Sequence, residues 1–183
     1  FESVVNNLGA KRPTVATPTT KAFTSATIGN TEYQLQTNAS ICNRLVKNSD
    51  GTISASWTFA ADPAWADRGT GYNYFDGTSW MAAPTVRLET VRTGFTNIGV
   101  TGSNAEVVVA HTTATADLAF LKRATKGTGA WTESMLGVPD VWARVSVGGP
   151  AGQSIHVISQ TTGVSGPIYM GQDGALAYTR SLD

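Results

Sequence analysis

The chain has 183 residues, with 13 Lys or Arg and 13 Asp or Glu, so its formal net charge is zero. That balance argues against a general nucleic-acid binder or a polybasic membrane module. A hydrophobic content of 41% argues against a disordered polyelectrolyte, and no apolar run approaches the ~20 residues of a membrane-spanning helix. Frequent Thr, Val and Gly beside few charged residues predict an all-β chain.

Residues 1–38 differ from the rest of the chain. The stretch Lys11–Thr27 is dominated by Thr, Ala, Pro and Lys and shows no sustained period of 2 or 3.6. We therefore expect an extended N-terminal arm or linker at 1–38, followed by a folded region at 39–183.

Short strand-like segments separated by turn residues begin at Asn43. The segments Asn43–Asn48 and Thr52–Ala60, joined by Ser49-Asp50-Gly51, predict a β-hairpin. Similar groups follow, so we expect three sets near 43–80, 97–131 and 143–183. A period of roughly 50 residues with several short strands per set predicts about three four-stranded antiparallel blades of an incomplete β-propeller. A β-sandwich, which also has short strands at regular spacing, is the alternative architecture.

The sequence contains no recognisable catalytic motif, metal-ligand cluster or phosphate-binding loop, so we predict no catalytic residue, no metal site and no cofactor. Cys42 is expected to be a small buried hydrophobic residue at the start of a strand. His111 and His156 fall in the second strands of their sets and are expected to be packed structural residues. The remaining large aromatic side chains are expected to fill the core between blades: Trp57, Tyr72, Tyr74, Trp80 and Trp131.

Two turns resemble a known structural motif. Asp76-Gly77-Thr78-Ser79-Trp80 and Gly127-Thr128-Gly129-Ala130-Trp131 resemble degenerate Asp-box turns, and Ser181-Leu182-Asp183 resembles the opening of another. In sialidase-like propellers this box joins the third and fourth strands of a blade and has a structural role. The stretch Ser54–Trp80, with Arg87–Gly94 after it, is similar to the N-terminal blades of secreted Bacteroidota propeller proteins.

This resemblance implies a secreted or cell-surface protein, exported as cargo of type IX secretion, and the N-terminal part of a longer chain that carries the remaining blades. It also implies a third blade whose last strand, Ala175–Arg180, has no outer neighbour. Such an edge predicts that residues 1–183 alone associate or are poorly soluble.

Long predicted connections on one face of the blades indicate a recognition surface. Residues 60–70, 81–96, 132–142 and 161–174 are expected to lie on that face, with short turns on the other. The residues expected to contact a protein or glycan ligand are Trp65, Asp67, Arg68, Arg87 and Arg92. The alternative is that Trp65 packs on a neighbouring blade and the charged side chains pair locally.

We therefore expect a non-enzymatic binding or adhesion module, with secretion or cell-envelope machinery as possible partners. A fragment of a sialidase-like carbohydrate-active hydrolase is the alternative function, because that family clamps a substrate carboxylate with arginines. The arginines available for such a clamp are Arg44, Arg87, Arg92, Arg123 and Arg144. A third interpretation is a structural component of a cell-envelope assembly.

Overall fold

The computed structural model describes residues 24–37, 42–114, 116–164 and 168–181, and all of their helical or strand structure is β-strand. The all-β prediction is confirmed. The strands are β1 (Leu45–Lys47), β2 (Ile53–Phe59), β3 (Gly69–Phe75), β4 (Thr93–Val100), β5 (Glu106–Thr112), β6 (Leu118–Arg123), β7 (Thr132–Met135), β8 (Asp140–Gly148), β9 (Ser154–Thr161) and β10 (Leu176–Arg180).

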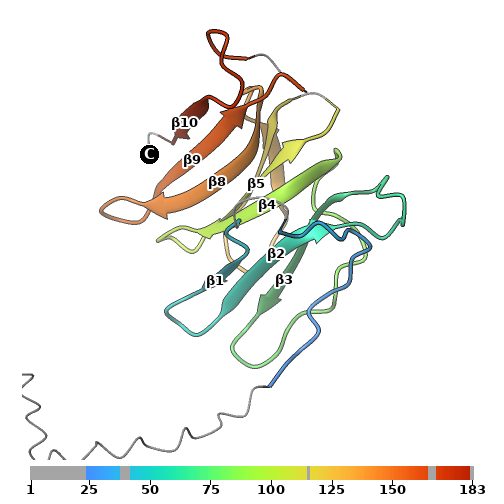
Figure 1. The fold of residues 1–183 in the computed structure, drawn as a ribbon. Coiled ribbons are helices and arrows are strands. Elements are labelled where there is room, and N and C mark those ends of the chain that lie inside the picture. The colour runs from blue at the N-terminus through green and yellow to red at the C-terminus, as the bar shows by residue number, and fades with distance from the viewer. Residues whose placement is uncertain (1–23, 38–41, 115, 165–167, 182–183) are drawn as a thin grey trace, which may run out of the picture.

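These strands form three antiparallel sheets that follow one another along the chain and stack side by side (Figure 1). Sheet 1 has the order β1-β2-β3, sheet 2 has the order β4-β5-β6-β7, and sheet 3 has the order β10-β9-β8. Within the described residues the three sheets form an open stack, not a closed ring.

Sheet 2 is the middle layer, and β5 is buried along its whole length. Because side chains alternate between the two faces of a strand, Val108 packs with Tyr72 of sheet 1, whereas Val107 and Val109 pack with Val157 of sheet 3. Both faces of β5 are therefore apolar, which explains why its sequence lacks the polar alternation of a half-exposed strand.

The sheets correspond strand by strand. In each sheet, one residue of the second strand lies opposite an aromatic residue of the third strand. The pairs are Ser56↔Tyr72, Val109↔Phe120 and Ile158↔Tyr178. The aromatic side chain of each pair lies on the face of its sheet that points toward the next sheet along the chain, or away from the preceding one. Tyr72 packs into the cluster shared with sheet 2, and Phe120 packs into the cluster shared with sheet 3. The same register aligns His111 with Thr58 and Gln160.

The observed strand bounds differ from the expected sets. Sheet 2 begins at Thr93 and extends through β7, so residues 132–135 form its fourth strand and are not part of a loop. In sheet 1 the segment after Trp80 runs beside β3 without forming a regular strand: Met81 N–H donates to Tyr74 O (2.9 Å) and Leu88 N–H to Thr70 O (2.9 Å). Hydrogen bonds of this irregular kind satisfy the β3 edge in place of a fourth strand.

The described part of the N-terminal arm, residues 24–37, lies against sheet 1. Glu32 N–H donates to Ala60 O (2.8 Å), and Asn73 Nδ2 donates to Ile28 O (2.6 Å). Gly29 approaches the Trp57 ring so closely that an added Cβ would lie 2.2 Å from it. Trp57 is therefore covered by the arm on the outer side of sheet 1, not by a second sheet.

A buried ion pair of sheet 2 accepts hydrogen bonds from sheet 1 near the hairpin turns. Arg123 Nε and Nη2 each lie 2.5 Å from Glu106 Oε2, and Tyr72 OH donates to Glu106 Oε1 (2.9 Å). The Arg123 guanidinium also lies over the rings of Tyr72 (4.4 Å) and Trp131 (4.5 Å). Of the predicted core aromatics, Tyr72, Tyr74 and Trp131 thus lie between the sheets, while Trp80 packs on Phe75 of its own sheet.

Candidate functional site

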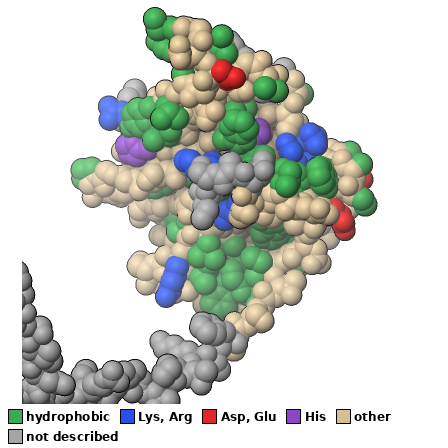
Figure 2. Space-filling view, viewed as in Figure 1, with side chains coloured by type: hydrophobic (Ala, Val, Ile, Leu, Met, Phe, Trp, Pro, Cys, Tyr) green, Lys and Arg blue, Asp and Glu red, His purple; other side chains and the backbone are tan. Residues whose placement is uncertain are grey.

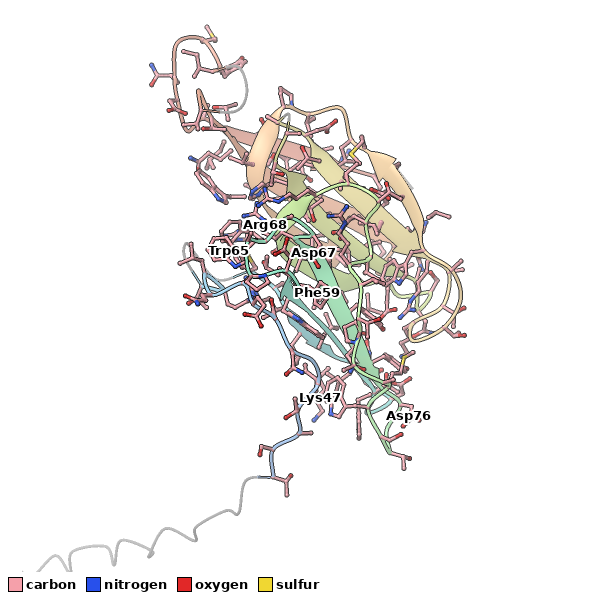
Figure 3. All side chains as sticks on the ribbon, turned by 90° about the vertical axis from the view of Figure 1, so that its right-hand side faces the viewer. Lys47, Phe59, Trp65, Asp67, Arg68 and Asp76 are labelled. Carbon is pink, nitrogen blue, oxygen red and sulfur yellow. The ribbon has the colours of Figure 1, made fainter. Side chains whose placement is uncertain are left out.

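The longest connections between strands, β2–β3, β3–β4 and β9–β10, reach one end of the stack, which we call the loop end. It comprises residues 60–68, 83–92 and 136–139, together with the described parts of the β5–β6 and β9–β10 connections, whereas the β6–β7 connection, residues 124–131, lies at the other end. Figure 3 shows Trp65, Asp67 and Arg68 at this end of β2 and β3, with Lys47 and Asp76 at the other. The sequence predicted this separation, but the 136–139 connection is shorter than expected because β7 occupies 132–135.

The structure brings the five predicted contact residues together. Arg92 Nε donates to Trp65 O (2.9 Å), Arg68 Nε donates to Thr93 O (2.9 Å), and Arg87 Nη1 donates to Arg68 O (3.3 Å). Asp67 accepts from the backbone N–H groups of residues 61 and 62 (2.9 and 3.1 Å). Each of these polar side chains therefore holds a loop backbone in place.

Trp65 packs downward onto the N-terminal arm. Its ring meets Tyr33 edge-on, with centroids 5.0 Å apart, and its Nε1 donates to Glu32 O (3.0 Å). Tyr33 belongs to a buried cluster with Cys42 and Phe95, and Trp65 packs against that cluster. The Arg68 guanidinium lies over the Tyr33 ring, with its carbon 5.1 Å from the ring centroid. Trp65 is therefore a packing residue, but it packs on the N-terminal arm and not on a neighbouring sheet, and the charged side chains bond to backbone groups and not to one another.

Burial and local charge shift the pKa values of groups at the loop end. Burial lowers the pKa of the Arg68 guanidinium, and the positive charge of Arg92 acts in the same direction. Burial raises the pKa of Asp67, but hydrogen bonds from backbone N–H groups outweigh this effect, so the pKa is lowered overall. Burial raises the pKa of Glu89, whose carboxylate accepts from Thr70 N–H (2.7 Å) and ties the 81–92 segment to β3.

A depression of about 410 Å³ opens between sheets 2 and 3 at the loop end. Its lining residues are His111, Thr112, Thr113, Val141, Trp142, Thr162 and Val164. This volume lies near the lower limit of small-molecule pockets. None of these residues was among the predicted contact residues, and His111 was expected to be a packed structural residue.

His111 and Trp142 form the polar and aromatic wall of the depression. Trp142 N–H donates to His111 Nδ1 (3.2 Å), so the neutral imidazole carries its proton on Nε2. Burial, helped by Arg68 and Arg144, lowers the pKa of His111 to about 4. The ring stacks on Phe95 (5.4 Å between centroids), and the Trp142 side chain is 37% exposed.

Backbone strain marks the same place. Phe95 in β4 and Trp142 in β8 have φ values of 54° and 50°, and both lie where the strand register shifts. Left-handed φ is unfavourable for a bulky side chain unless surrounding contacts impose it. Phe95 is buried in the cluster with Tyr33, and Trp142 lines the depression. No local sequence signal identified these positions in advance.

The arginines proposed for a carboxylate clamp do not converge. Arg123 is buried with Glu106 near the opposite end, and Arg144 Nη1 donates to the carbonyl oxygens of Trp142 (3.0 Å) and Ala143 (2.8 Å). Arg44 donates to the Gln36 side chain. No carboxylate is among the described residues that line the depression.

Two searches of the described residues were negative: no group of three or more His, Cys, Asp or Glu side chains is placed to hold a metal ion, and no helix could span a membrane. Comparisons of the chain with protein-family models, curated proteins and solved structures found no match.

Proposed function

We propose that this protein is a binding module that recognises a protein or glycan ligand with its loop end. The observation that carries the proposal is that the longest connections, and the depression lined by His111 and Trp142, lie at one end of the stack of sheets. Loops on such a scaffold can vary without disturbing the core, which is how binding surfaces commonly arise.

We also propose that the three sheets are blades of an incomplete β-propeller and that the protein is secreted or displayed on the cell surface. The repeated correspondence between sheets and the turn at Asp76 support the propeller. Asp76 Oδ1 accepts from Thr78 N–H (2.7 Å) and Ser79 N–H (2.8 Å), as a structural turn motif requires. Export by type IX secretion rests on the sequence resemblance alone.

The ligand contacts proposed here centre on the depression, with Arg68 and Arg92 at its margin. The exposed Trp142 ring offers an apolar surface, and His111 Nε2–H offers a hydrogen bond. This combination suits a ligand with both an apolar face and hydrogen-bond acceptors. Trp65, Asp67 and Arg87 then act mainly by holding the loops that surround it.

Binding of a glycan array and of candidate surface proteins, measured with the 183-residue chain, tests the proposal. Replacing a central aromatic contact commonly costs ~2 kcal/mol or more, so Trp142→Ala should weaken binding by more than ~10-fold without lowering the melting temperature. Trp80→Ala, at the opposite end, is the matched control and should leave affinity unchanged. Equal affinities for wild type and Trp142→Ala would reject the site.

A carbohydrate-active hydrolase is the second candidate. Arg68 and Arg144 near His111 favour it, because a cationic surface suits an acidic sugar. A sialidase-like reaction also needs a tyrosine nucleophile and an acid/base carboxyl group, and no carboxylate is among the described residues that line the depression. Fluorogenic glycosides, sialosides included, separate the candidates. Turnover that disappears in Arg92→Ala would establish the hydrolase, whereas ligand binding without turnover would support the binding module.

A further inference from the structure

The outer side of sheet 3 exposes large apolar side chains. Leu176 is 78% exposed, Tyr178 is 59% exposed and Ile158 is 49% exposed. All three lie on the face opposite Ile155 and Val157, which pack against sheet 2. Figure 2 shows hydrophobic side chains gathered on the surface over β9 and β10. We call this surface the outer face of sheet 3.

The corresponding positions of the preceding sheets are buried in contacts between sheets. The pairing register aligns Ile158 with Val109, Leu176 with Leu118 and Tyr178 with Tyr72. Val109 and Leu118 are buried between sheets 2 and 3, and Tyr72 is buried between sheets 1 and 2. The outer face of sheet 3 therefore has the same arrangement of side chains as the faces that form the sheet 1–sheet 2 and sheet 2–sheet 3 contacts.

The polar groups of this face indicate what it would contact. At the sheet 1–sheet 2 contact, Tyr72 OH and Ser54 Oγ both donate to the carboxylate of Glu106 in the following sheet. The corresponding groups of sheet 3 are Tyr178 OH and His156, whose Nδ1 lies 2.7 Å from that hydroxyl. When Nδ1 carries the proton and donates to the hydroxyl oxygen, Tyr178 OH is left to donate to a carboxylate from a following sheet, as Tyr72 OH donates to Glu106.

Charge distinguishes two possible occupants. Arg180 is exposed and lies opposite His156 in the β9–β10 pair. The two ion pairs found among the described residues are those of Arg123 and Lys126, so neither involves Arg180. A second copy that used the same face would bring like charges together, which is unfavourable. A different sheet that carries an acidic side chain is complementary in charge to Arg180 on this face.

We propose that the outer face of sheet 3 is a docking surface for a further antiparallel β-sheet, which presents an aliphatic face and a carboxylate to Tyr178 and His156. The aliphatic side chains cover Ile158 and Leu176, as Val157 covers Val109 inside the stack. The carboxylate accepts from Tyr178 OH, as Glu106 accepts from Tyr72. This surface is distinct from the loop end, so either proposal can fail without the other.

Nitration by tetranitromethane tests the proposal because a second tyrosine serves as an internal standard. Tyr169, in the β9–β10 connection, is 62% exposed and does not belong to the outer face. In the purified 183-residue chain Tyr178 and Tyr169 should react at similar rates. In the protein isolated with its natural assembly intact, Tyr178 should react at least ~10-fold more slowly relative to Tyr169, as expected for a site about nine-tenths occupied.

Two variants and a cross-link complete the experiment. Ile158→Asp should abolish the protection of Tyr178, whereas Val86→Asp, at an exposed residue of the loop end, should not. A photo-cross-linker at position 178 should label a peptide with alternating apolar residues and an Asp or Glu. Equal nitration in both preparations, protection that grows with concentration of the purified chain, or a cross-link to this chain's own peptides would overturn the proposal.

Discussion

The buried Glu106–Arg123 pair should contribute strongly to the contact between sheets 1 and 2. Glu106 is fully buried and accepts hydrogen bonds from Arg123, Tyr72, Ser54 and Gly127 N–H (3.1 Å). Replacing Arg123 by Met keeps much of the side-chain volume but leaves the carboxylate without its counter-charge. Removing one partner of a buried pair typically costs ~3–5 kcal/mol.

The loss of cation–π contacts adds to this effect. The guanidinium lies over two aromatic rings, and such contacts contribute ~0.5–2 kcal/mol each when desolvated. Because the free energy of unfolding of a small domain is only ~5–15 kcal/mol, Arg123→Met should remove a large fraction of the total stability. Equilibrium urea unfolding, followed by tryptophan fluorescence at constant pH, measures the change.

A double-mutant cycle separates charge pairing from packing. Glu106→Gln combined with Arg123→Met should destabilise less than the sum of the single changes, because the double variant leaves no uncompensated charge. Lys126→Met is the control, since it removes a pair with the exposed Asp50 and should have a much smaller effect. Additive single effects, or an Arg123→Met cost below ~1 kcal/mol, would refute the reasoning.

Three further predictions follow from the described contacts. Trp65→Ala should lower the melting temperature, because it removes packing on Tyr33; an unchanged melting temperature with weakened ligand binding would restore Trp65 as a contact residue. His111 has a folded pKa of about 4 against an ordinary 6.5, so its contribution to stability is complete above pH 6.5 and is lost as pH falls toward 4, by ~3 kcal/mol in total. Unfolding measured from pH 7 to 4 should show a shallower pH dependence in His111→Asn, and identical slopes would contradict this. Gly127→Ala should destabilise, because Gly127 has φ 74° and an added Cβ would lie 2.3 Å from the Tyr74 ring; thermal melting that matches wild type would show that the turn can move.

The apolar and turn patterns of the sequence were sufficient to predict an all-β chain with hairpins near the observed ones. The segment Glu106–Thr112 became β5, and the Ser49-Asp50-Gly51 turn joins β1 to β2. These features depend on neighbouring residues in the chain, so local sequence encodes them. The prediction that Cys42 is buried was also correct, but Cys42 precedes β1 and does not lie at the start of a strand.

Strand ends depended on contacts that sequence patterns do not contain. Residues 132–135 read as a loop because they show no apolar alternation, yet they pair with β6 as an edge strand. Sheet 1 lacks a matching regular strand, since residues after Trp80 instead make scattered hydrogen bonds to β3. In both places the available partner edge decided the structure.

The sequence also determined which side chains are suited to recognition, but not which of them are available for it. Trp65 and Trp142 are equivalent in residue type, and only the folded chain shows that Trp65 is held by Tyr33 and Glu32 O while Trp142 borders an open depression. A Trp ring stabilises a core or binds a ligand through the same apolar surface, so burial by distant segments decides between the roles. That burial is a property of the stacked sheets, which bring residues 31–33 and 65 together and leave residue 142 at the surface.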